Sequence, residues 1–304
     1  MRRRNSFRSC VQACEILELR TVLSSSSFVN NILTITGSNA KNTITVTETD
    51  SQIVVRIDNN PQKNFLKYIP DVSIIFEIKV FSLSGNDLVT VTVTDESVRG
   101  YHIDVYVDGG KGNDVLTLII GNGTLVGGPG NDRLKAGIGG ANLYGGEGND
   151  TLIGDDGGDA LSGDQGNDFL VGNGAGDYLF GAQGNDSIIG GSGDDALFGG
   201  SGNDRLFGND GNDSLWDFDG KNLLDGGSGD DRFLVLSVTN TILGGSGDDM
   251  ITLGYFAPYG LIDGGSGNDT LSSPIVNLNG NEVFAFRVFD QASIINMEIG
   301  VTYL

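Results

Sequence analysis

Three successive units of nine residues fill positions 181–207, and they read GAQGNDSII, GGSGDDALF and GGSGNDRLF. The same period runs outward in both directions and covers 109–252 as 16 units without an insertion or deletion. Eleven residues follow at 253–263, and a last unit, GGSGNDTLS, fills 264–272. The span 109–272 holds 44 of the 49 glycines, so the glycine content of the chain belongs to this repeat.

Position eight of the unit is apolar in all 16 units. The residues are Leu116, Leu125, Leu134, Leu143, Leu152, Leu161, Leu170, Leu179, Ile188, Leu197, Leu206, Leu215, Leu224, Phe233, Ile242 and Ile251. An amphipathic helix needs an apolar residue every three or four positions, so one in nine excludes it. The spacing predicts a short strand followed by a glycine-rich turn, because glycine adopts positive φ without steric cost.

Position six is aspartate in 12 of the 16 units and in the last unit. These aspartates are Asp114, Asp132, Asp150, Asp159, Asp168, Asp177, Asp186, Asp195, Asp204, Asp213, Asp231, Asp249 and Asp269. The exceptions are Gly123, Ala141, Asn222 and Asn240. The unit matches G-G-x-G-x-D-x-U-x, and over slightly more than half the chain the sequence resembles the RTX, or hemolysin-type, calcium-binding repeat proteins.

The resemblance implies an all-β fold, a parallel β-roll (β-solenoid) with 18-residue coils and position eight between two sheets. It also implies that Ca²⁺ lies between turns stacked on the same side, held by the aspartates named above and by backbone carbonyls. Sorted by side, each edge carries six consecutive aspartates, Asp114 to Asp204 on one and Asp159 to Asp249 on the other. Neighbouring pairs suggest about ten ions, and the 25 acidic and 6 basic residues of 109–272 give a compensating charge of −19.

The segments around the repeats divide the chain further. Residues 27–108 alternate apolar and polar side chains at 32–36, 43–47 and 53–57, which predicts a β-rich segment leading into the solenoid near Ser82. Residues 273–304 contain strand-like sequence at 283–289 and at 294–295, which favours a C-terminal β cap because solenoid ends need covering. A C-terminal type I secretion signal is the alternative.

Residues 1–26 are interpreted as a leader for export. They begin with Arg2, Arg3 and Arg4, and the stretch at 17–24 resembles the LExRxLLS-type leaders of bacterial surface and secreted proteins. A Val-Gln-Ala-Cys sequence ending at Cys14 is only a weak lipobox, since no apolar run precedes it. We expect a secreted or cell-surface bacterial protein.

Position nine on one side of the roll forms an apolar series with Tyr144, Phe180, Phe198 and Trp216. Because position eight points inward, position nine points outward, and either neighbouring side chains cover these rings or they contact a glycan or a partner protein.

Catalytic motifs are absent from the sequence: there is no P-loop, no G-x-S-x-G and no H-E-x-x-H. The net charge of −22 excludes a nucleic-acid partner, and no apolar run reaches the length of a membrane-spanning helix. The sequence therefore predicts a non-enzymatic, exported calcium-binding protein acting as a structural or adhesive surface or matrix module. The alternative is a calcium-dependent parallel β-helix enzyme acting on acidic polysaccharide.

Overall fold

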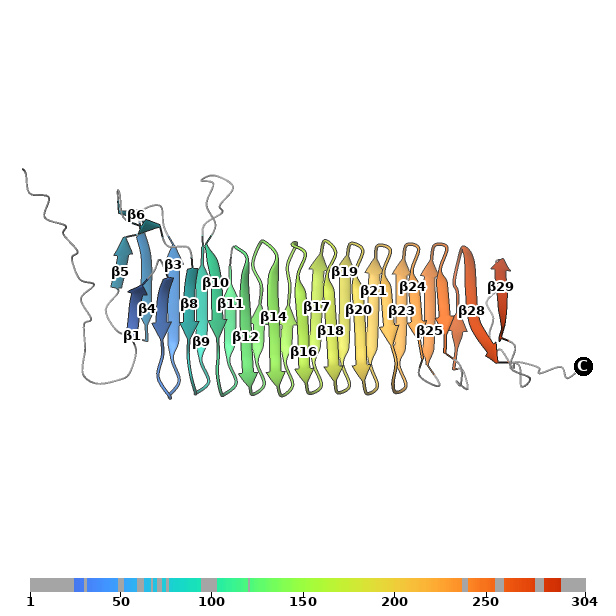
Figure 1. The fold of residues 1–304 in the computed structure, drawn as a ribbon, viewed down its shortest axis with the longest axis horizontal. Helices are drawn as coiled ribbons and strands as arrows, with labels where there is room; N and C mark the ends of the chain where they lie inside the picture. The colour runs from blue at the N-terminus through green and yellow to red at the C-terminus, as the bar shows by residue number, and fades with distance from the viewer. Residues whose placement is uncertain are drawn as a thin grey trace, which may run out of the picture.

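The computed structural model describes residues 25–29, 32–48, 52–58, 63–66, 68–69, 73–74, 77–93, 103–119, 121–236, 240–254, 260–276 and 282–290. Every regular element in these ranges is a β-strand. The strands stack as successive coils along one axis and form an elongated rod (Figure 1). The expected all-β parallel β-roll is confirmed.

Two long sheets form the walls of the rod, and from β8 to β28 successive strands alternate between them. In spatial order, the first sheet contains β1 (Ser25–Val29), β2 (Ile32–Thr36), β8 (Glu77–Phe81), β10 (Asp104–Asp108), β12 (Gly123–Pro129), β14 (Ala141–Glu147), β16 (Ala160–Gln165), β18 (Tyr178–Gln183), β20 (Ala196–Ser201), β22 (Ser214–Asp217), β24 (Arg232–Val235), β26 (Met250–Leu253), β28 (Asn268–Val276) and β29 (Glu282–Asp290). The second contains β27 (Ile262–Asp263), β25 (Thr241–Ser246), β23 (Leu223–Ser228), β21 (Arg205–Asp210), β19 (Ser187–Ser192), β17 (Phe169–Gly174), β15 (Thr151–Ile153), β13 (Arg133–Lys135), β11 (Val115–Leu118), β9 (Leu88–Thr92), β3 (Thr43–Glu48), β4 (Gln52–Ile57) and β5 (Lys63–Leu66). A small separate hairpin pairs β6 (Tyr68–Ile69) with β7 (Ser73–Ile74).

The register repeats every 18 residues through the nonapeptide region, as expected for two units per coil. Leu125 pairs with Leu143, and Leu116 pairs in parallel with Leu134 in the opposite sheet. Upstream, the spacing between partners grows: β10 pairs with β8, 27 residues earlier, and β8 pairs with β2, 45 residues earlier. The parallel stacking therefore begins at β2 and β3, earlier than Ser82.

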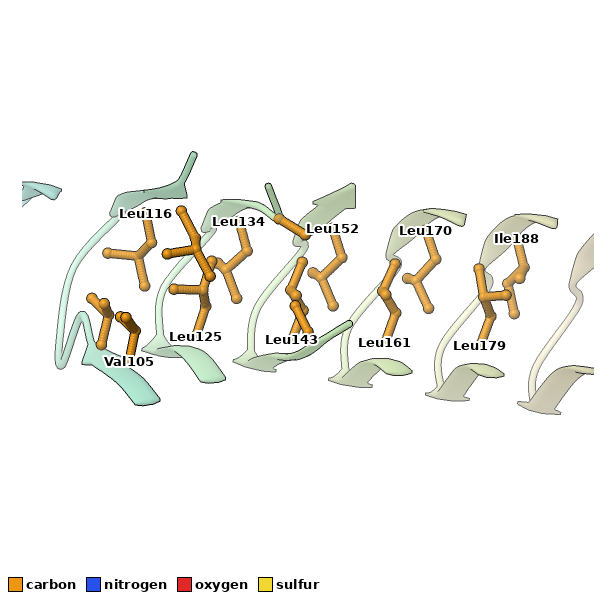
Figure 2. Packing of buried hydrophobic residues seen from close by; sticks show 14 of the residues in the cluster. Val105, Leu116, Leu125, Leu134, Leu143, Leu152, Leu161, Leu170, Leu179 and Ile188 are labelled. Carbon is orange, nitrogen blue, oxygen red and sulfur yellow. The ribbon is translucent and has the colours of Figure 1, made fainter. Parts of the chain in front are cut away.

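The core is a double row of apolar side chains between the two sheets (Figure 2). Leu125, Leu134, Leu143 and Leu152 come from alternate sheets and are all fully buried. Burying a leucine side chain contributes roughly 1.5–3 kcal/mol. Each inner strand adds such a side chain to the row and also pairs with the strands of the neighbouring coils in its own sheet.

Antiparallel strands close the ladder of parallel strands at both ends. β1 pairs antiparallel with β2, and β4 and β5 extend the second sheet beside β3. At the other end, β29 pairs antiparallel with β28 and contains the strand expected at 283–289. Residues 1–24 of the candidate leader at 1–26 and the apolar pair Ile294 and Ile295 lie outside the described residues, and the last two residues of the candidate leader, Ser25 and Ser26, begin β1.

Candidate functional site

The position-six aspartates of one edge form a continuous hydrogen-bonded ladder. In each coil, Oδ1 accepts a hydrogen bond from the backbone N–H of the position-six residue in the preceding coil, at 2.7–2.8 Å. The ladder runs through Asp87, Asp114, Asp132, Asp150, Asp168, Asp186, Asp204, Asn222 and Asn240. The period of the sequence thus brings together aspartates that are 18 residues apart.

The second edge carries an equivalent ladder. It begins at Ala141, whose N–H donates to Asp159 Oδ1 at 2.7 Å, and it continues through the remaining aspartates predicted on that edge. The last step joins Asp249 N to Asp269 Oδ1 at 3.1 Å, across 20 residues rather than 18. The segment 253–263 is two residues longer than a repeat unit, and this additional length leaves the ladder intact. All 13 predicted aspartates are buried.

The second carboxylate oxygen, Oδ2, is buried and receives no hydrogen bond in most of these residues. This applies to Asp87, Asp114, Asp132, Asp150, Asp168, Asp177, Asp186, Asp195, Asp204, Asp213, Asp231 and Asp249. A buried acceptor without a partner costs roughly 1–3 kcal/mol, and more when it is charged. So many such atoms, aligned in two columns, indicate that a cation belongs beside them.

The space beside each Oδ2 is defined by the glycine at position one of the same unit. A Cβ placed on Gly109 would lie 2.6 Å from Asp114 Oδ2 and 2.9 Å from the carbonyl oxygen of Gly127, the position-one glycine of the next coil. We call this space the cradle of the unit. It brings a carboxylate oxygen and a carbonyl oxygen together, and glycine at position one keeps it open.

The columns are electrostatically unfavourable without a cation. Burial raises the pKa of Asp132, Asp177 and Asp213 to about 7, although the backbone N–H bound to each carboxylate lowers it. The neighbouring aspartates of the column raise these pKa values further. Desolvation is the largest cause, so near neutral pH the carboxylates need positive charge to remain buried as anions.

The donor set fits a hard divalent cation. Ca²⁺ takes six to eight oxygen ligands from carboxylates, backbone carbonyls and water, which are the groups that line the cradles. In the described residues no three His, Cys, Asp or Glu side chains converge, so backbone carbonyls must supply a large part of any coordination sphere. This donor set excludes a zinc site of the nitrogen and sulfur type.

Two features of the edges were missed by sequence reasoning. Asp87 extends the first column, and the signal was available because the imperfect unit at 82–90 is in register with the repeat. Its position one is Ser82, whose hydroxyl donates to the Gly109 carbonyl at 3.0 Å and partly fills that cradle. A second, exposed ladder joins position-five asparagines, and in it the backbone N–H of Asn131, for example, donates to Asn113 Oδ1 at 3.0 Å. Apart from the recurrence of asparagine at position five, the sequence contains no feature that predicts this ladder.

The aromatic residues at position nine form a stack on the outer face of the first sheet. The ring of Phe198 lies between Phe180 and Trp216, with centroid distances of 4.5 and 4.4 Å and interplanar angles of 8° and 18°. Tyr144 is separated from this stack by Ser162 and is 43% exposed. The stacked rings therefore cover one another's faces and leave mainly their edges to solvent.

Comparison with known proteins identifies the repeat. A family model described as the RTX calcium-binding nonapeptide repeat (4 copies) matches residues 120–140, 136–170, 171–206, 198–233, 239–254 and 261–273. No curated protein matches the chain. Among the described residues, no helix has the length and apolar character needed to cross a membrane. Across residues 120–273 the chain is therefore a member of the RTX calcium-binding repeat family, whose nonapeptide repeats bind Ca²⁺.

Proposed function

We propose that this chain is an exported protein whose β-roll folds on binding about ten Ca²⁺ ions and then serves as a structural or adhesive module at a cell surface or in a matrix. The observation that supports this proposal is the alignment of buried Oδ2 atoms without hydrogen-bond donors beside glycine carbonyls. In the proposal the 13 position-six aspartates are the metal ligands, residues 109–272 form the calcium-binding unit, 27–108 lead into it, and 273–304 cap it.

Folding on binding follows from the balance of charges and entropy. Without metal, the roll would bury columns of like charges, and its glycine-rich turns would lose much backbone entropy on ordering. Calcium binds the native cradles and has no equivalent site in the unfolded chain, so binding free energy becomes folding free energy. The metal-free chain is accordingly unfolded at neutral pH in this proposal.

Export explains how such a chain obtains its metal. Extracellular calcium modules bind with Kd values of roughly 10⁻⁴–10⁻³ M, far above the Ca²⁺ concentrations to which cytosolic sensors respond. A chain with cradles of this kind stays unfolded inside the cell and folds outside. Bacterial RTX repeat proteins are typically secreted, which supports the same route.

A non-enzymatic role is favoured over action on an acidic polysaccharide. A groove on the first sheet is lined by Trp216 and Arg232 together with the carboxylates of Asp177, Asp195 and Asp230. Because the carboxylates of this groove outnumber its single arginine, Arg232, the groove would repel a polyanion such as an acidic polysaccharide. The aromatic stack of Phe180, Phe198 and Trp216 is the contact surface in this proposal, with Tyr144 beside it. Because a sugar ring packs on an exposed aromatic face, the mutual stacking of the rings favours a partner protein over a glycan.

Circular dichroism of the full chain tests the proposal directly. We expect little β signal in chelator, a large gain in millimolar Ca²⁺, and no comparable gain in equal Mg²⁺, which requires a smaller octahedral site. Calorimetric titration of the same sample should count about ten ions per chain. Equal β content in chelator and in Ca²⁺ would show that the metal does not fold the roll.

A further inference from the structure

Four units lack glycine at position one, where they carry Leu118, Ala136, Asp217 and Val235, and Asp217 is the charged residue among them. The unit at 217–225 begins with Asp217 where most units have glycine, and this aspartate is fully buried at the end of β22. A Cβ placed on Gly199, one coil earlier, would meet Asp217 Oδ2 and would lie 2.7 Å from Asp204 Oδ2. The cradle of Gly199 therefore contains a second carboxylate oxygen, whereas the cradle of Gly181, one coil earlier, has the backbone carbonyl oxygen of Gly199 in that place.

Local hydrogen bonds fix the orientation of the Asp217 carboxylate. Its Oδ1 accepts from Asn222 Nδ2 and from the backbone N–H of Asp219, the latter at 3.1 Å. Asn222 is itself held in the ladder, since its Oδ1 accepts from Asp204 N at 2.7 Å. With Oδ1 engaged on one side, Oδ2 is directed toward Asp204.

The neutral side chain of Asn222 also explains why the column of aspartates ends at this coil. Its Nδ2 donates to Asp217 Oδ1 and to the carbonyl of Asp219, so an amide occupies the place at which the other coils have a carboxylate. Asp204 is thus the last position-six aspartate of this column, and beyond it the ladder continues through Asn222 to Asn240.

Asp204 supplies the independent sign of a ligand. It is 1% exposed, and its Oδ2 receives no hydrogen bond although it is directed into the cradle. Two buried carboxylate oxygens facing one another repel unless a cation or a proton lies between them. Calcium affinity rises with the number of charged ligands in a site.

We propose that Asp204 and Asp217 form a cation site that has one carboxylate more than the other cradles of the repeat and binds Ca²⁺ more tightly than they do. This inference rests on the proposed function, because it assumes that the other cradles also take calcium. It assigns to Asp217, which lies outside the position-six pattern, the role of a metal ligand.

Calcium titration of the full chain, followed by calorimetry, separates this site from the others. In the wild type we expect one ion bound about tenfold more tightly than the rest. Asp217→Gly restores the residue of the repeat, so the fold should persist and the tight event should disappear. Asp217→Asn should weaken it as well. The control is Asp219→Asn, which removes the same charge from an exposed carboxylate two residues away and should keep the tight event.

The possible outcomes distinguish this inference from the proposed function. If Asp217→Gly retains the tight event, or if all ions in the wild type bind equally, the paired site is wrong while calcium binding stands. If Asp204 and Asp217 share a proton instead of a metal ion, the wild type should also show no tight event, and the paired site is again wrong. If the wild type takes up no calcium, the proposed function itself fails.

Discussion

Substitution of a single position-one glycine should block one calcium cradle. The most informative change is Gly172→Ala, because a Cβ there would contact Asp177 Oδ2 and would lie 2.7 Å from the carbonyl oxygen of Gly190. The matched control is Gly174→Ala in the same turn. Its Cβ would come no closer than 3.2 Å to a neighbour, the Cα of Asp156, and position three carries side chains in most other units.

The expected cost follows from two effects. A Cβ forced against a carboxylate and a carbonyl costs about 1–3 kcal/mol of overpacking. Loss of one ion removes about 2.7 kcal/mol when free Ca²⁺ is about 100 times Kd, as at about 10 mM for Kd near 10⁻⁴ M. Gly172→Ala should therefore lower the free energy of unfolding by about 4–6 kcal/mol, whereas Gly174→Ala should change it by less than about 1 kcal/mol.

The assay is denaturant unfolding in saturating calcium, followed by the fluorescence of Trp216, the sole tryptophan. Calorimetric titration of both variants gives the number of ions. We expect Gly172→Ala to bind at least one ion fewer than Gly174→Ala. Equal ion counts and equal stabilities for the two variants would refute the location of the cation in the cradle.

Three further predictions concern charge, backbone and the aromatic stack. In the calcium-free chain, burial raises the pKa of position-six aspartates such as Asp114, Asp132 and Asp177 from 3.8 to about 6–7. Their protonation therefore stabilises the fold fully below about pH 4, and this stabilisation is lost as the pH rises through 7. Circular dichroism in chelator should show more β structure at pH 5 than at pH 7.5, and a flat profile would contradict this. Ala182 has a φ of 77°, so Ala182→Gly should stabilise the roll by about 1 kcal/mol in denaturant unfolding, while Ala196→Gly in strand β20 should destabilise it by about 0.5–1 kcal/mol. Phe198 stacks on both Phe180 and Trp216, whereas Phe180 stacks on Phe198 alone among these rings. Phe198→Leu should therefore lower the free energy of unfolding by roughly 1–3 kcal/mol and Phe180→Leu by roughly 0.5–1.5 kcal/mol, and equal losses would contradict a contribution from each stacked pair.

Much of the fold and of the two columns could be predicted because a fixed period fixes the register. Once Leu125 and Leu143 are known to occupy the same position of neighbouring coils, Asp132 and Asp150 must also be neighbours. A solenoid turns periodicity in sequence directly into proximity in space, since each coil contacts only the next. No long-range inference is needed.

The parts that escaped prediction are those where the period is broken or where side-chain orientation decides. Asp87 precedes its partner in the column, Asp114, by 27 residues instead of 18, so the 18-residue period does not predict that the two are neighbours. Asp217 departs from the consensus at position one, and the entry of its Oδ2 into the neighbouring cradle depends on the orientation of its side chain, which a sequence pattern does not give. Likewise, the outward direction of Phe198 follows from alternation, but its stacking between two rings depends on side-chain torsion angles.

The most direct test of the account is a calcium anomalous difference map from crystals of the full chain grown in millimolar Ca²⁺. The account predicts two rows of peaks, about ten in all, along the two edges of the roll. Each peak should lie between a position-six carboxylate, such as that of Asp186, and the position-one carbonyl of the next coil, such as that of Gly199. Peaks that lie away from these cradles, or only one or two peaks in the whole molecule, would contradict it.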